Sequence, residues 1–152
     1  MSIFEKRNGE KIIRKIYKFL HENYRKAPNL PLPNGIQVRV NKCKVFPNSC
    51  KKTWSAKLYQ GGQLVSNCDA IMVGKSMAEI NIGTEEAYRR KGYGTIAARA
   101  LIDKLLEDKI TPCWSAWPFR KESQHLALKL GFEHQVDVNA WIWMESMQNK
   151  KC

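Results

Sequence analysis

The segment "EINIGTEEAYRRKGYGT" (residues 79–95) joins a strand pattern to the start of a helix, and it is the most informative stretch of the sequence for the architecture. Ile80 and Ile82 alternate with polar residues, which is typical of a strand with one buried face. The helix predicted to begin near Gly94 carries an apolar stripe made of Ala98, Leu101, Ile102 and Leu105. A strand followed by such a helix indicates a sheet with helices packed on it.

The turn between this strand and this helix predicts a site for a phosphate or pyrophosphate compound. Three basic residues, Arg89, Arg90 and Lys91, run directly into Gly92 and Gly94. A helix N-terminus presents backbone N–H groups that lack helical partners, and it carries partial positive charge. The glycines leave that backbone uncovered, and the basic residues add full charges beside it.

The remaining patterns extend this mixed architecture in both directions. Residues 9–26 predict a helix, because Ile12, Ile13, Ile16, Tyr17, Leu20 and Tyr24 recur at helical spacing. Strands are predicted at 36–45, 53–59, 63–73, 77–83, 112–117 and 136–144, with a connector at 27–35, a hairpin turn at 60–62 and a helix at 121–132 that ends at Gly131. The order predicts a mixed α/β fold.

Length and composition favour one domain, residues 1–152, with a basic helix and connector at 1–35 and the sheet core at 36–152. Residues 1–60 hold 14 Lys and Arg against 3 Asp and Glu, which indicates an acidic partner or a solubilising surface. No apolar run suits a membrane span or a signal peptide. The five cysteines lack metal-site spacing. We therefore expect a cytoplasmic protein without a metal.

Two ligands fit the glycine-rich turn. Residues 92–97 match G-x-G-x-x-G/A, the pattern of a dinucleotide site. However, the charged segment 84–91 separates the strand from the first glycine, and no acidic residue ends "PCWSAW" (112–117) to bind a ribose. These departures disfavour a dinucleotide, and the second ligand is implied by a resemblance that the same residues carry.

"YRRKGYGT" resembles the acyl-CoA signature Q/R-x-x-G-x-G/A of the GNAT superfamily of N-acyltransferases. Arg89, Gly92 and Gly94 occupy its three fixed positions, and "EINIGT", "WSAW" and "LALKLGFE" resemble its flanks across residues 64–144. The combination looks closest to the branch that contains the zwittermicin-resistance acetyltransferases. The resemblance implies a mixed, mostly antiparallel sheet that splays between "EINIGT" and "PCWSAW" to hold acyl-CoA.

The resemblance also implies direct transfer of an acetyl group from acetyl-CoA to an amine. The residues it assigns to acetyl-CoA are Ile82, Gly83, Thr84, Arg89, Arg90, Lys91, Gly92, Tyr93, Gly94, Thr95 and Ser123. A backbone N–H near residues 82–84 would stabilise the developing oxyanion. Glu79, on the polar face of the strand, is the candidate base, and the alternative is an ordinary exposed glutamate.

Relatives often carry a tyrosine that protonates the departing thiolate, and that position aligns with Ala127. Trp114 and Trp117 flank the splay. Their side chains are expected either to line an acceptor pocket or to pack in the core, and core packing is favoured. The N-terminal helical region is expected to form a wall of the acceptor site. The resemblance implies an acceptor amine on a small molecule, a protein or a peptide, and the sequence does not identify which. The alternative function is a non-catalytic module that binds CoA or nucleic acid.

Overall fold

The computed structural model of the chain describes residues 10–44, 48 and 50–142. Its elements are β1 (Glu10–Lys18), α1 (His21–Lys26), β2 (Ile36–Cys43), β3 (Thr53–Gln60), β4 (Gln63–Val73), β5 (Met77–Thr84), a 3-10 turn (Glu86–Tyr88), α2 (Tyr93–Glu107), β6 (Thr111–Ala116), α3 (Lys121–Lys129) and β7 (Glu133–Ile142). None of the described helices is both long enough and apolar enough to cross a membrane.

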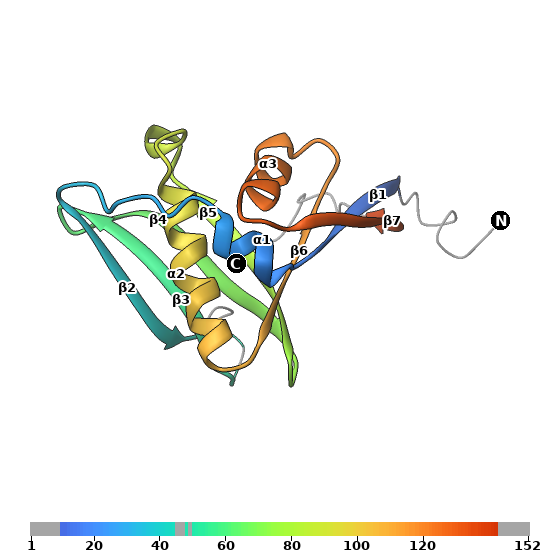
Figure 1. Ribbon diagram of the computed structural model, residues 1–152, viewed down its shortest axis with the longest axis horizontal. Coiled ribbons are helices and arrows are strands. Elements are labelled where there is room, and N and C mark those ends of the chain that lie inside the picture. Colours follow the sequence, from blue (N-terminus) through green and yellow to red (C-terminus); the bar gives the residue numbers. More distant parts are fainter. Residues whose placement is uncertain (1–9, 45–47, 49, 143–152) are drawn as a thin grey trace, which may run out of the picture.

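All seven strands form one sheet in the order β2-β3-β4-β5-β6-β1-β7 (Figure 1). Every neighbouring pair is antiparallel except β5 and β6, which run parallel. Helix α2 packs on the half formed by β2 to β5, and α3 packs on β6 and β7. The predicted mixed, mostly antiparallel sheet with flanking helices is therefore confirmed.

The apolar stripe of α2 forms the centre of the core. Ala98, Leu101, Ile102 and Leu105 are almost completely buried, as the helical spacing predicted. They face small and medium side chains of β3 and β4, including Ala56, Leu58, Val65 and Cys68. Burial of each large aliphatic side chain stabilises the fold by roughly 1.5–3 kcal/mol. This packing fixes α2, and therefore its N-terminus, against the sheet.

The prediction of one helix over residues 9–26 is wrong. The structure has strand β1 at Glu10–Lys18 and only a short helix, α1, at His21–Lys26. Strand β1 lies between β6 and β7 and is hydrogen-bonded to both. Three of its residues are isoleucines, whose branched side chains favour strands, and pairing on both sides overrides the local helical spacing.

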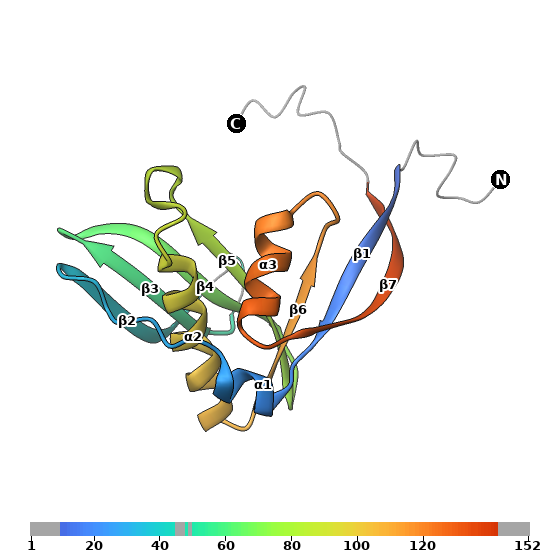
Figure 2. The ribbon, with the colours of Figure 1, turned by 45° about the horizontal axis from the view of Figure 1, so that its top comes forward.

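Strands β5 and β6 pair at one end and then diverge. Their register contains only Met77 with Thr111, Ala78 with Pro112 and Glu79 with Cys113. Beyond Glu79, β5 continues to Thr84 without a neighbour on the β6 side, as Figure 2 shows. The predicted splay between these two strands is therefore present, and it leaves backbone polar groups of β5 unpaired on one side.

Candidate functional site

A cleft of about 690 Å³ occupies the splay between β5 and β6. Its walls come from both strands, the turn before α2, the start of α3 and one residue of β1. The residues that line it are Arg14, Ile71, Glu79, Ile80, Asn81, Ile82, Gly83, Thr84, Arg89, Arg90, Gly94, Trp114, Ser115, Ala116, Trp117, Phe119, Arg120, Lys121, Glu122, Ser123 and Leu126. Five of these residues are basic and two are acidic, so the cleft favours an anionic ligand.

One end of the cleft lies at the N-terminus of α2, and we call it the helix end. The first helical hydrogen bond of α2 runs from the N–H of Ile96 to the carbonyl of Gly92. The N–H groups before Ile96 precede any helical acceptor and remain available to a ligand. Gly94 lines the cleft here, and an added Cβ would lie 3.5 Å from Oγ1 of Thr84 and 3.7 Å from Leu126. The glycine therefore keeps open a space that a larger side chain would fill.

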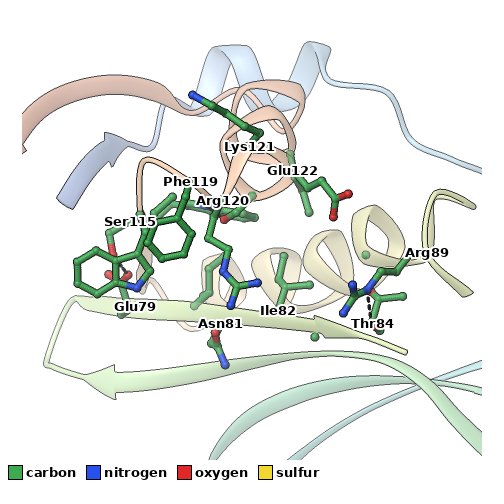
Figure 3. A pocket seen from close by; sticks show the side chains of 18 of the residues that line it. Glu79, Asn81, Ile82, Thr84, Arg89, Ser115, Phe119, Arg120, Lys121 and Glu122 are labelled. Carbon is green, nitrogen blue, oxygen red and sulfur yellow. Dashed lines mark hydrogen bonds between the residues drawn. The ribbon is translucent and has the colours of Figure 1, made fainter. Parts of the chain in front are cut away.

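Basic side chains line the cleft from two directions. Arg89 and Arg90 come from the turn before α2, and Arg120 and Lys121 come from the start of α3. The Nε of Arg89 donates to the carbonyl of Thr84 at 3.1 Å, which holds the guanidinium at the end of β5 (Figure 3). Arg90 adopts φ 62°, a left-handed conformation that is uncommon outside glycine. The arrangement suits phosphate groups.

Four residues assigned to the cofactor from sequence do not line the cleft. Lys91 is exposed, with Nζ 5.5 Å from the ring of Tyr88. Tyr93 and Thr95 are buried in the first turn of α2, so only their backbone groups belong to the helix terminus. Gly92 caps the helix at φ 82°. The other seven assigned residues, together with Glu79, line the cleft.

The opposite end of the cleft, which we call the Glu79 end, holds a chain of hydrogen bonds across three strands. The Nε of Arg14 on β1 donates to Oγ of Ser115 on β6 at 3.0 Å. The hydroxyl of Ser115 donates in turn to Oε1 of Glu79 on β5 at 2.5 Å. The guanidinium of Arg14 lies over the ring of Trp117, 4.1 Å from its centroid. A carboxylate, a hydroxyl and a guanidinium are thus fixed relative to one another.

The two ends of the cleft face opposite sides of the sheet. Ile82 and Thr84 point towards α2, because an added Cβ on Gly94 would contact both. Side chains alternate along a strand, so Glu79 and Asn81 point to the other face. Figure 3 shows Glu79 and Ser115 at one end of the view and Thr84 with Arg89 at the other. A ligand in the cleft could therefore reach through the sheet.

Ser123 and Trp114 meet where α3 approaches the cleft. The Nε1 of Trp114 donates to Oγ of Ser123 at 3.2 Å, and the indole packs on Phe132 with ring centroids 5.3 Å apart. Trp114 is buried, as expected of a core residue, and it also lines the cleft. Ala127 is fully buried and does not reach the cleft, whereas Leu126 does. The described lining residues include no tyrosine.

Arg14, Ser115 and Arg120 were not assigned to the site from sequence. Arg14 lies in the segment for which a helix was predicted, and its partner Ser115 is 101 residues away in the chain. A strand interpretation of residues 10–18 would have put Arg14 on one face with two isoleucines, which is the available signal. Arg120 is the N-cap residue of α3, and it forms part of the cleft wall.

Comparisons with known proteins agree with this geometry. A model of the GNAT acetyltransferase family matches residues 30–141. An uncharacterized N-acetyltransferase of Bacillus subtilis, YdfB, is 34% identical over 82 residues, which is 54% of this chain and 31% of that protein. A GCN5-related N-acetyltransferase-like protein from Streptococcus suis has a TM-score of 0.73 at 22% identity, over 91% of this chain and 64% of that one.

A tandem GNAT protein from the clavulanic acid biosynthesis pathway also shares the fold, with a TM-score of 0.61 at 11% identity over 86% of this chain and 53% of that one. At these identities, the solved structures show a common fold. The chain spans about a third of the curated relative and between half and two thirds of these two structures.

Proposed function

Because the chain belongs to the GNAT acetyltransferase family, we propose that it is an N-acetyltransferase that moves an acetyl group from acetyl-CoA directly to an amine. The observation that carries this proposal is the cleft at the splay of β5 and β6. It joins an anion-binding helix terminus to a carboxylate, with unpaired strand backbone between them. Such a cleft suits a long ligand with phosphates at one end and a reactive group at the other.

The residues present fit acetyl-CoA at the helix end. The backbone N–H groups at the start of α2 and the side chains of Arg89, Arg90 and Arg120 would hold its phosphates. The unpaired backbone of β5 would hydrogen-bond the extended arm, since Glu79 to Thr84 spans about 17 Å of strand. Ser123, on α3, also lines the cleft and would be a further contact.

Acetyl-CoA supplies the acetyl group as an activated thioester, and a C–N bond forms as the C–S bond breaks. The amine must lose a proton, because only about one lysine-like amine in 2500 is neutral at pH 7. We assign Glu79 to accept that proton, since it lines the cleft where the strands begin to diverge. A backbone N–H near residues 82–84 would stabilise the oxygen on which negative charge develops.

Direct transfer agrees with the environment of the cysteine beside Glu79. Burial raises the pKa of the Cys113 thiol, and the nearby Glu79 carboxylate raises it further. A protonated thiol is a poor nucleophile, which disfavours an acetylated cysteine as a carrier. With Ala127 where relatives often have a tyrosine, we assign no side-chain acid to the departing thiolate.

The acceptor is proposed to be a small amine rather than a protein. The sequence resemblance to the branch that contains the zwittermicin-resistance acetyltransferases supports this choice. We also propose that residues 1–152 act as one domain, because β1 is built into the sheet between β6 and β7 and contributes Arg14 to the cleft.

The test combines ligand binding with turnover. Acetyl-CoA should raise the melting temperature of the protein, and NAD should not. Release of free CoA should then depend on an added amine when a panel of small amines, peptides and proteins is compared. Stabilisation by NAD without a response to acetyl-CoA would overturn the proposal, and so would acetyl-CoA binding without amine-dependent CoA release.

A further inference from the structure

The Glu79 end of the cleft holds two opposite charges that are bridged by a single hydroxyl. Ser115 accepts a hydrogen bond from Nε of Arg14 and donates its own proton to Oε1 of Glu79. A hydroxyl has one proton, so this pattern fixes its orientation. Glu79 and Arg14 are thus held close together without a direct ion pair of their own.

Both charged groups keep unused hydrogen-bonding atoms. Within the described residues, Oε2 of Glu79 makes no hydrogen bond, and neither do Nη1 and Nη2 of Arg14. A guanidinium offers a planar pair of N–H donors that matches the two oxygen atoms of a carboxylate. Glu79 offers an acceptor beside it. The pair therefore presents a positive and a negative binding point to one ligand.

The surroundings of Arg14 increase the free energy that it would gain by binding an anion. Its guanidinium lies against the ring of Trp117 and is only partly exposed. Burial lowers the pKa of Arg14, and attraction to Glu79 acts in the opposite direction. A charge that has lost part of its hydration gains more from a paired anion than a fully solvated charge does.

We propose that the acceptor is an α-amino carboxylate, such as a free amino acid, whose carboxylate binds Arg14 and whose amine lies at Glu79. This inference rests on the proposed function and adds the substrate class. The single hydroxyl between the two residues matches a ligand whose amine and carboxylate are one or two carbon atoms apart. A phosphate dianion fits less well, because its second negative charge would lie beside Glu79.

The other basic residues of β1 do not supply this contact. Lys15 forms an ion pair with Asp137 at 3.6 Å. Lys11 and Lys18 are exposed and do not line the cleft. Their charges act only through a screened field, whereas Arg14 reaches the cleft itself. Arg14 is therefore the basic residue of β1 that would contact the carboxylate of the acceptor.

The first experiment needs only the unmodified protein. CoA release is measured with acetyl-CoA and matched pairs of acceptors, each an L-amino acid and its carboxamide. The α-amino group of the carboxamide has a lower pKa than the α-amino group of the free amino acid. The values of kcat/KM are therefore compared after each is divided by the fraction of acceptor whose amine is neutral. The amino acids should be preferred by about tenfold or more, which is what one charge-assisted bidentate contact supports.

The second experiment assigns the preference to Arg14. In Arg14→Gln the preference should fall to within about twofold through a higher KM for the amino acid, with the Kd of acetyl-CoA unchanged. Arg14→Lys keeps the charge without the planar fork and should retain part of the preference. Lys18→Gln on the same strand is the matched control and should behave as wild type. If Arg14→Gln fails to fold, the preference of the wild type for amino acids over carboxamides, and the change in that preference in Arg14→Lys, still test the inference.

The outcomes separate this inference from the function on which it rests. Equal use of amino acids and amides by the wild type would overturn the inference and leave N-acetyl transfer intact. A preference for an aminophosphonate over the matching amino acid would also overturn it. Acetyl-CoA binding without CoA release for any amine would overturn both.

Discussion

The two ends of the cleft are built in different ways. The helix end comes mostly from one continuous segment, residues 82–95, and it offers backbone groups, glycines and basic side chains. The Glu79 end is assembled from three strands, and each contributes one side chain to a hydrogen-bonded chain. The helix end therefore depends on local backbone geometry, whereas the Glu79 end depends on how distant strands pair.

Because the two ends are built differently, we expect mutations at the helix end to change ligand binding and mutations at the Glu79 end to change turnover. At the helix end, bulk or negative charge on a glycine should block the ligand, while loss of one of several basic side chains should have a smaller effect. At the Glu79 end, the loss of one side chain should change the chemistry and leave cofactor binding intact. The comparison fails if changes at either end affect binding and turnover alike.

The largest effect is expected from Glu79→Gln. The substitution keeps the size of the side chain but removes the proton acceptor, so kcat should fall by about 10²–10⁴-fold. The Kd of acetyl-CoA should stay nearly unchanged, because the phosphates bind at the other end. Steady-state kinetics and titration with acetyl-CoA measure the two quantities. Glu22→Gln, on the exposed surface of α1, is the control. A loss below tenfold, at a pH where the amine is mostly protonated, would remove Glu79 as the base.

Gly94→Glu should act on binding instead. The new side chain would enter the space between Thr84 and Leu126 and place a negative charge beside the phosphates. The Kd of acetyl-CoA should rise by about 100-fold, equivalent to about 2.7 kcal/mol. Calorimetric titration and thermal shift measure this loss. An unchanged Kd in a folded variant would show that the donor binds elsewhere.

The pH profile tests whether the Glu79 end contains an acid that protonates the departing thiolate. No tyrosine occurs among the described residues that line the cleft. The rate should therefore rise by about tenfold per pH unit until the acceptor amine reaches its own pKa, and it should not fall again near pH 10. Single-turnover measurements isolate the chemical step. An alkaline fall that disappears when one other residue is mutated would identify a missed acid.

The smallest effects concern the stability of the ligand-free protein and should have opposite signs at the two glycines. Gly94 lies within α2 at an ordinary φ, and an added Cβ finds only normal contacts, so Gly94→Ala should stabilise the fold by about 0.4–1 kcal/mol. Gly92 has φ 82°, and its Cβ would lie 2.8 Å from Leu30, so Gly92→Ala should destabilise the fold by about 1–2 kcal/mol. Urea unfolding without ligand measures both. Changes of the same sign would contradict this geometry.

Most of the fold could be predicted from local patterns. The strands from 36 to 84, α2, β6 and α3 follow from alternation, turn residues and helical spacing. The N-terminal strand could not be predicted, because its isoleucines fit both a helical and a strand period. Pairing with β6 and β7, which lie far along the chain from β1, determines which of the two periods is realised.

The candidate site likewise has one part that could be predicted from neighbouring residues and one part that could not. The sequence located the helix end, because the basic turn and the glycines are neighbours in the chain. It also put Glu79 on the correct strand face, since alternation is local. It missed Arg14 and Ser115, because their contact exists only after β1 has joined the sheet beside β6.

A crystal structure of the protein with acetyl-CoA would show where the acetyl donor binds. We predict that the phosphates lie at Gly94 and the arginines of the helix end, and that the extended arm follows β5 towards Glu79. A second cavity, of about 540 Å³, lies at the far end of α2 and is lined by Lys42, Lys51, Lys52 and Lys75. Acetyl-CoA bound in that cavity, with the splay between β5 and β6 empty, would contradict the account.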